Sequence, residues 1–395
     1  MRSVCGLDFL QAGNAIWISA MDRNGLFQYD LINKEMAFKG VFSGENMWAS
    51  NLHCSILEWC EHLIFVPSMA KHIALYDLKT GVIDLSDLPR DIEMIDHKFG
   101  YAVIWKNKLF LVGDQVPDIY ILDLNTRKYR KLNSLQLIIN TKYKGMPYIS
   151  ADYVIKNEFI FVITRHSGAV YKINMDTETI QEYWISDAEG GHALICHDGK
   201  NFWCLENFEF ELRCWNEKNG VIEKVKIPRG LYDEGGSWTE SICFEGKILL
   251  FQTQNIVFFD PNNKKFSSLQ ESDLNLMFDS EQRNTDLDHH KYTRRIFADR
   301  QISNSLFFLT DKGKMYRMRQ NHTIEETDTF ISINWLMEEK IRWMNQIKMQ
   351  QIMNEQNECS IEIFMEYVKM ANIFQQGKKS EYGKIISKEL LGGNV

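Results

Sequence analysis

The sequence predicts an all-β fold made of seven similar units of four antiparallel strands, followed by an α-helical tail. Three observations carry this prediction. Short apolar runs recur at a steady interval, each run lies between polar turns, and the pattern changes to helical spacing after Phe330. Internal repeats of this length are typical of architectures in which one supersecondary unit is used many times.

The repeat is anchored on the first apolar run of each unit. Successive runs begin 43 to 58 residues apart, and the longest interval carries the polar insertion DSEQRNTDLDHHKY. The seven runs are IWIS at Ile16, LIFV at Leu63, LFLV at Leu109, FIFV at Phe159, FWCL at Phe202, ILLF at Ile248 and LFFL at Leu306.

Each run has the same surroundings. A polar turn such as WKNK or FEGK precedes it, and a second apolar stretch such as IALYDL or IYILDL follows it. Short turns with Gly or Asn suit tight hairpins, because these residues adopt positive φ at little cost. A further turn and a more polar stretch, such as IEKVKI, complete a unit of four strands.

The difference in polarity between the strands of a unit predicts how the units pack. The second apolar stretches are almost continuously apolar, as expected for a sheet that is covered on both faces. A single four-stranded sheet is only marginally stable, whereas sheets that stack around a closed ring bury both faces and leave short edges.

In this respect the chain resembles a kelch-type or WD-type β-propeller over residues 1–330. The double glycine of kelch blades occurs only as Gly190-Gly191 and Gly235-Gly236, and the Gly-His and Trp-Asp signature of WD repeats is missing. The resemblance therefore implies the β-propeller class and no particular functional family. The seven repeat units predict seven blades, or six if the first or last unit is incomplete or borrowed to close the ring.

Residues 331–395 form a second region. Apolar residues from Ile333 to Ile352 and from Ile361 to Ala371 recur at helical spacing and include several methionines. Two interpretations stay open. The helices cover an edge or face of the propeller, or their methionine-rich surfaces dock on a partner protein.

Composition narrows the class of protein. The net charge of -8 argues against a general binder of nucleic acid or anionic membrane, which needs a basic surface. No run of 18 apolar residues and no signal peptide are present, and the eight cysteines form no CxxC pair. We therefore expect no membrane span and a cytoplasmic location with reduced thiols.

The repeat also predicts where a ligand would bind. In a propeller, the loops that enter the innermost strands share one face around the central channel with the loops between the second and third strands. We expect the following ligand-binding candidates on this channel face: Trp48, His53, Tyr101, Tyr148, Arg165, His166, His192, Trp238, Glu240, Tyr292, Arg294 and Arg295. Their mixture of aromatic rings and charges suits peptides, sugars or acidic groups. The alternative is that aromatic residues at these positions simply fill the core.

Catalytic signatures are missing. The sequence has no P-loop, no G-x-G-x-x-G, no G-x-S-x-G and no H-E-x-x-H. The segment DLDHH has metal-ligand residue types but is better interpreted as a solvated loop, and His192 and His197 face opposite sides of an extended strand. His166 beside Arg165 would need an orienting carboxylate to act as a base. We therefore expect no catalytic residue, no metal and no cofactor.

Three functions remain. The leading one is a non-enzymatic scaffold that binds a protein or peptide partner on the channel face. The alternative is a carbohydrate-binding or carbohydrate-active propeller that uses Trp48, Tyr148, Trp238, Arg165, Glu240 and Arg294. The third is a metal-dependent lyase or hydrolase, which requires a His, Asp and Glu cluster at the channel.

Overall fold

The computed structural model describes twelve stretches of the chain. These are residues 2–3, 6–21, 23–46, 49–132, 147–187, 191–232, 238–252, 255–269, 294–297, 306–309, 314–330 and 332–333. Every regular element in these stretches is a β-strand. The predicted helical tail lies outside them, apart from residues 332–333.

Seven four-stranded antiparallel sheets follow one another along the chain, and in each sheet the strands lie side by side in sequence order. The first three sheets contain β2 (Phe9–Ala12), β3 (Ala15–Ser19), β4 (Leu26–Asp30) and β5 (Glu35–Gly40); β6 (His53–Trp59), β7 (His62–Pro67), β8 (His72–Asp77) and β9 (Ile83–Asp87); and β10 (Phe99–Trp105), β11 (Lys108–Gly113), β12 (Ile119–Asp123) and β13 (Tyr129–Lys131). The fourth and fifth contain β14 (Ile149–Lys156), β15 (Phe159–Thr164), β16 (Ala169–Asn174) and β17 (Ile180–Trp184); and β18 (His192–His197), β19 (Phe202–Glu206), β20 (Glu211–Asn216) and β21 (Gly220–Lys226). The last two contain β22 (Trp238–Phe244), β23 (Lys247–Gln252), β24 (Asn255–Asp260) and β25 (Lys265–Ser268); and β26 (Arg294–Phe297), β27 (Leu306–Leu309), β28 (Lys314–Met318) and β29 (Ile324–Phe330).

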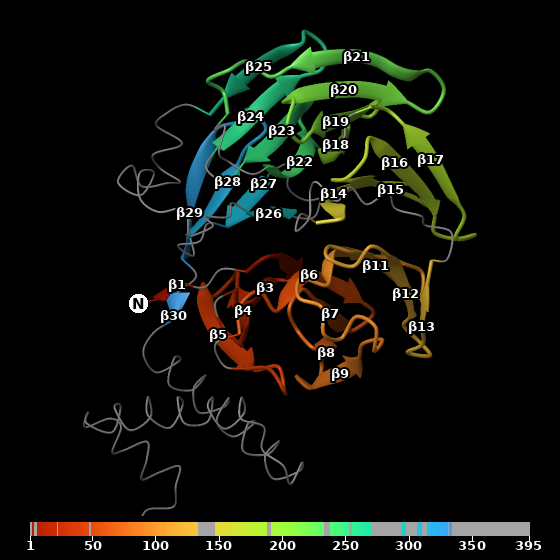
Figure 1. Cartoon of the computed structure of the whole chain (residues 1–395). Helices are drawn as coiled ribbons and strands as arrows, with labels where there is room; N and C mark the ends of the chain where they lie inside the picture. The colour runs from red at the N-terminus through yellow and green to blue at the C-terminus, as the bar shows by residue number, and fades with distance from the viewer. Residues whose placement is uncertain are drawn as a thin grey trace, which may run out of the picture.

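The sheets are arranged around a common centre, with the first strand of each innermost (Figure 1). Inner strands of successive sheets touch from β2 to β22, and β2 also touches β26 of the last sheet. The two ends of the ring are joined a second time, because β1 (Arg2–Ser3) pairs with β30 (Ser332–Ile333). This arrangement confirms the predicted β-propeller class.

The hydrophobic core is divided among the gaps between sheets. Six clusters of buried side chains each combine two consecutive sheets, from the first and second to the sixth and seventh. In the second gap, for example, Ile64 and Leu75 of one sheet pack against Leu109 and Leu111 of the next. Both faces of the middle strands are therefore covered, which explains why those strands read as continuous apolar runs.

The turns between the third and fourth strands share one hydrogen-bonding pattern. In six sheets the third strand ends in a residue whose side-chain Oδ1 accepts hydrogen bonds from the main-chain N–H groups two and three positions further on. These residues are Asp30, Asp77, Asp123, Asn174, Asn216 and Asp260. The residue four positions further on has positive φ in each case. Such Asx turns hold the outer strand in register with the third.

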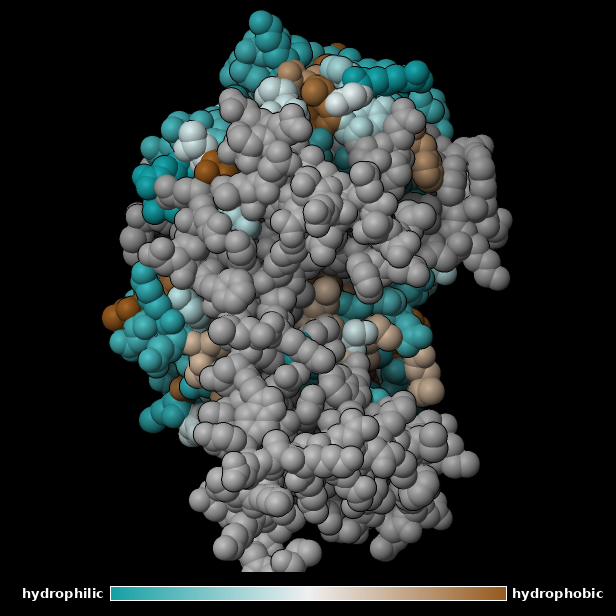
Figure 2. Space-filling view, turned by 90° about the vertical axis from the view of Figure 1, so that its left-hand side faces the viewer, coloured by the Kyte–Doolittle hydropathy of each residue, from teal (hydrophilic) through white to brown (hydrophobic). Residues whose placement is uncertain are grey.

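The outer surface is mainly polar. On the face in Figure 2, the described residues are mostly hydrophilic and the hydrophobic ones are scattered. Fourth strands such as β9 and β21 consist of exposed and half-buried residues. In the portion of the chain covered by the structure, no helix has the length and apolarity needed to cross a membrane.

Candidate ligand site on the channel face

The channel face is built by main-chain hydrogen bonds that run from sheet to sheet. Lys98 donates its N–H to the carbonyl of Ser68 at 2.8 Å, and its own carbonyl accepts from Asp114 at 2.9 Å. Tyr148 then donates to the carbonyl of Asp114 at 2.8 Å and accepts from Arg165 at 3.2 Å. The loops of the second, third and fourth sheets therefore form one continuous belt whose main-chain groups are paired.

Asp114 is the most unusual side chain of this belt. It follows β11 directly, and its atom Oδ1 is buried without a hydrogen-bond partner. Burial raises the pKa of Asp114 to about 6, although the nearby charges of His97 and Arg165 act in the opposite direction. Desolvation therefore outweighs the favourable charges around this carboxyl group.

Arg165 follows β15 at the equivalent place in the next sheet. Its guanidinium donates to Oδ1 of Asn207 at 3.2 Å and to the carbonyl of Trp238 at 3.4 Å, whereas its Nε is buried without a partner. Burial lowers the pKa of Arg165, and the charges of Asp114 and Asp152 oppose that effect. This one side chain thus connects the fourth, fifth and sixth sheets and still has a donor to offer.

An aromatic pair lies beside these charges. The ring centres of Tyr148 and His166 are 5.2 Å apart, at an interplanar angle of 36°. Tyr148 is half-buried, whereas His166 is only 3% exposed. The combination gives the site an unpaired acceptor atom, an unpaired donor atom and an aromatic ring on one face.

A buried network fixes the strands below the belt. Oδ2 of Asp152 in β14 accepts from the N–H of Ile195 in β18 at 2.9 Å and from the hydroxyl of Ser241 in β22 at 2.5 Å. The hydroxyl of Ser150 donates to the carbonyl of Ala193. Inner strands of three sheets are therefore held together directly beneath Arg165.

Several other predicted site residues are buried within the fold. His53 is 3% exposed, its Nδ1 lies 2.8 Å from Oγ of Ser19, and burial lowers its pKa to about 3. Tyr101 is 3% exposed and stacks on Tyr153, with ring centres 4.1 Å apart.

His192 and Trp238 are 0% and 4% exposed. Burial is also the main cause that lowers the pKa of His192 to about 3, with the charge of Arg213 acting in the same direction. Trp238 packs against Phe210 and Tyr232. These two side chains, like His53 and Tyr101, fill the space between sheets.

The remaining predicted residues are only partly defined. Glu240 is half-buried in β22. Arg294 and Arg295 belong to β26, where the structure gives the backbone alone. Trp48 and Tyr292 lie outside the described residues.

The site also contains residues that are not among the ligand-binding candidates predicted from the sequence. Asp114 and Asn207 occupy the position directly after the second strand of their sheets, as Arg165 does. An exact register of the seven units would have identified them, because all three positions are equivalent. Asp152 could not be found in this way, since its partners come from two other sheets. In the stretches that the structure describes, no group of three or more His, Cys, Asp or Glu side chains could hold a metal ion.

Comparison with known proteins defines the fold. No family model and no curated protein sequence matches the chain. A streptogramin B lyase structure matches with a TM-score of 0.56 and 12% identity, over 83% of this chain and 95% of that chain. The chain is a β-propeller.

Two further structures support this assignment. The extracellular domain of a B. thetaiotaomicron protein, described as a putative hybrid two-component system, matches with a TM-score of 0.53 and 15% identity, over 80% of this chain and 38% of that chain. Virginiamycin B lyase from Staphylococcus aureus matches with a TM-score of 0.50 and 14% identity, over 73% of this chain and 88% of that chain. Identities this low establish the shared fold alone, and the same fold supports unrelated functions.

Proposed function

We propose that this propeller is a non-enzymatic scaffold that recognises a protein or peptide partner on its channel face. The observation that carries the proposal is the pair formed by Asp114 and Arg165. Each has a buried polar atom without a partner, and both lie on the same belt. Buried polar groups are normally paired, so an unpaired acceptor next to an unpaired donor supports a site that a ligand completes.

The chemistry of the pair favours a peptide. Oδ1 of Asp114 accepts a hydrogen bond, and Nε of Arg165 donates one. An amide of a peptide main chain, or of an Asn or Gln side chain, supplies one donor and one acceptor together. The half-buried ring of Tyr148 would cover the flat face of such a group.

The test is binding of the full chain to an array of diverse synthetic peptides. We expect Asp114→Asn and Arg165→Gln to lower the affinity for the selected peptides about tenfold or more, because each variant loses one hydrogen bond to a charged group. Glu61→Gln and Lys218→Gln are matched controls, since both residues are exposed in turns between neighbouring strands. Peptides that bind all four variants equally well would rule out the channel face as their site.

A carbohydrate is the second candidate, supported by the half-buried Tyr148 beside Arg165. A thermal-shift screen against sugars and sugar phosphates separates the two. Stabilisation by a sugar that disappears in Tyr148→Ala would favour the carbohydrate. The 4% exposure of Trp238 argues that this ring is not a sugar-stacking surface in the present conformation.

The remaining expectations from the sequence belong to the same proposal. The scaffold would work in the cytoplasm, in keeping with its cysteine usage, and the amphipathic segment 331–395 would supply a second docking element. Substituting apolar residues of that segment should then weaken the binding of the partner protein without changing the affinity of the channel face for peptides.

A further inference from the structure

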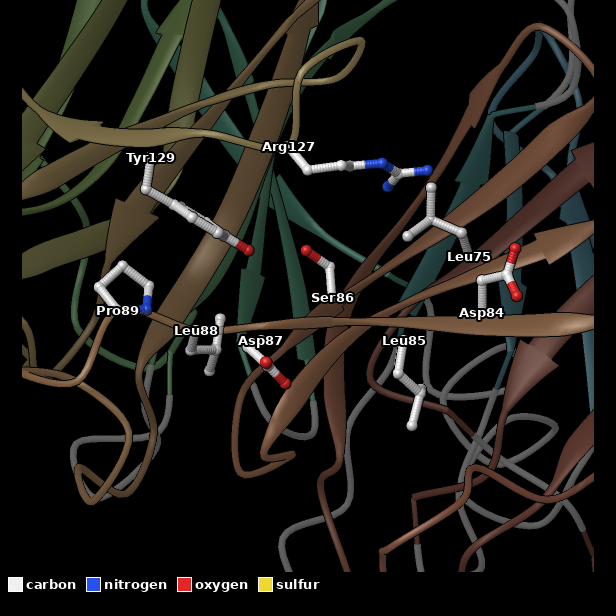
Figure 3. A pocket seen from close by; sticks show the side chains of 9 residues that line it. All are labelled: Leu75, Asp84, Leu85, Ser86, Asp87, Leu88, Pro89, Arg127 and Tyr129. Atoms are coloured by element: carbon white, nitrogen blue, oxygen red, sulfur yellow. The ribbon is translucent and has the colours of Figure 1, made fainter.

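A pocket of about 650 Å³ opens between the outer strands of the second and third sheets, away from the channel-face belt. One wall is β9 and the segment that follows it, and the other is β13 with the turn before it (Figure 3). Leu75, Leu88 and Tyr129 provide apolar surface, while Asp84, Asp87 and Arg127 provide charge.

The pocket exists because the two outer strands are unequal. β9 has five residues, whereas β13 has only three and begins at Tyr129. The chain before β13 is occupied by the Asx turn of Asp123, in which Arg127 has φ 59. β13 is therefore too short to cover β9 along its whole length.

β9 also has a free edge. It is the last strand of its sheet in the described part of the chain and pairs only with β8 there. An uncovered edge strand presents unpaired N–H and C=O groups, to which an extended peptide can add as a further strand.

Side chains alternate along this edge. Ser86 and Asp84 point toward Tyr129 and Arg127, whereas Leu85 and Asp87 point to the other side (Figure 3). The hydroxyl of Tyr129 is directed at Ser86 (Figure 3), and burial raises the pKa of Tyr129 to about 12, so it stays protonated at neutral pH. A peptide on β9 would thus meet hydroxyl groups and apolar surface within the pocket.

The segment that begins at β9 is predominantly negative, whereas the opposite wall of the pocket carries the basic Arg127. From Asp84 to Asp96 the chain has five acidic residues and one basic residue, Arg90. The side chain of Asp87 is 95% exposed, and Nδ1 of His72 lies 3.2 Å from its Oδ1. Leu85 is 37% exposed and Met94 is 90% exposed, so apolar surface accompanies the acidic groups.

We propose that this pocket binds an extended peptide segment of another protein, with one apolar side chain inserted between lysine or arginine residues. The peptide adds along β9, and its apolar side chain packs against Leu75, Leu88 and Tyr129. Because side chains alternate along a strand, the flanking cationic side chains point to the opposite face of β9, where Asp87 lies. The site is separate from the channel face and does not depend on the function proposed for it.

The probe is a library of short capped peptides with Leu, Ile or Phe at the centre and Lys at the flanking positions. A matched library carries Glu in place of Lys. Binding to the full chain is measured by fluorescence anisotropy at low and high salt. We expect the Lys library to bind more tightly than the Glu library, with an affinity that falls as salt rises.

Two variants locate the site. Ser86→Trp fills the pocket and should abolish binding, whereas Ser267→Trp, on the exposed side of the outer strand β25, should leave it unchanged. Asp87→Asn should weaken binding about fivefold, and Glu35→Gln on the outer strand β5 should not. Hydrogen exchange of the full chain should show protection of β9 when the peptide is bound.

Three results would overturn the proposal. The first is no preference for the Lys library over the Glu library. The second is unchanged binding by Ser86→Trp. The third is loss of binding in Asp114→Asn with no effect of Asp87→Asn, because the peptide would then occupy the channel face.

Discussion

The carboxylate of Asp152 in β14 accepts the hydroxyl hydrogen bond of Ser241 in β22 at 2.5 Å, although a whole sheet lies between these strands in the sequence. The same oxygen accepts from the N–H of Ile195 in the intervening β18. Asp152 is 1% exposed. One buried charge therefore connects the inner strands of three sheets beneath the proposed ligand site.

Replacing this carboxylate should destabilise the propeller. Asp152→Ala leaves the N–H of Ile195 without its acceptor, and the hydroxyl of Ser241 keeps the carbonyl of Ile195 at 3.1 Å. We therefore expect a loss of about 2–4 kcal/mol in the free energy of unfolding. Asp187→Ala, at an exposed position, is the control. In a double-mutant cycle with Ser241→Ala, the two effects should not add. Additive losses would mean that the two side chains act independently.

The carboxyl group of Asp114 should lower the stability of the fold when it is ionised, whereas the carboxylate of Asp152 raises it. The folded-state pKa of about 6 lies above the ordinary value of 3.8, so the carboxyl is easier to ionise in the unfolded chain. Wild-type stability should therefore fall as the pH rises from about 4 to 6, and the cost remains above that range.

Asp114→Asn removes this cost. At pH 8 we expect the variant to be about 1–3 kcal/mol more stable than the wild type, since each unit of pKa shift corresponds to about 1.4 kcal/mol and part of the group is hydrated. The difference should vanish near pH 4. Urea unfolding at both pH values measures it. A variant that is less stable at both pH values would show that the carboxylate has a structural partner.

The sequence predicted the fold well because its evidence is local and repeated. Apolar runs such as LIFV became β7, and LFLV became β11, each in the middle of a sheet as expected. The side chains that end third strands, such as Asp77 and Asn174, recur at the same point of each unit and form the same turn. Seven copies of one pattern outweigh the ambiguity of any single copy.

The candidate site was harder to predict, because its properties arise between sheets. The sequence placed Arg165 and Tyr148 on the channel face, but Asp114 became notable only when its burial was known. It also could not show that His53, His192 and Trp238 are almost completely buried. Residues at the start of an inner strand can point between the sheets or toward the channel, and one sequence does not separate these outcomes.

The Asx turn at Asp77 can be tested by mutation, because other sheets already carry Asn at the equivalent position. Oδ1 of Asp77 accepts the N–H groups of Thr80 and Lys79, both at 2.8 Å, and the bond from Thr80 is the largest cause that lowers the pKa of Asp77. Asp77→Ala should lower the midpoint temperature of unfolding. Asp77→Asn should be tolerated, because Asn174 and Asn216 already make the same turn.

The pH dependence of stability distinguishes an ionised Asp from a neutral Asn as the acceptor at position 77. Because the folded-state pKa of Asp77 is lowered, its ionised form contributes stability above the ordinary value of 3.8, and this contribution is lost as the pH falls through the lowered pKa. Asp77→Asn does not titrate, so the gap between wild type and this variant should narrow in acid. Equal gaps at pH 7 and in acid would exclude an ionised acceptor.

Gly191 is the glycine for which the structure gives the clearest requirement. Its φ is +60°, and a Cβ atom there would lie 2.3 Å from the carbonyl oxygen of Thr164 and 2.7 Å from that of Ser167. Its own carbonyl accepts the N–H of Asn207 at 3.2 Å, so the residue belongs to the channel-face belt. A side chain at this position would push the fourth and fifth sheets apart.

Gly191→Ala should therefore cost at least about 2 kcal/mol in the free energy of unfolding, and it should displace Asn207 from the guanidinium of Arg165. Gly13→Ala is the matched control, because Gly13 has φ +58° but no atom within 4 Å of its would-be Cβ. It should lose only about 1 kcal/mol, the cost of the backbone conformation. Chemical unfolding of both variants gives the comparison, and equal losses would show that φ alone, without close packing, explains the glycine at position 191.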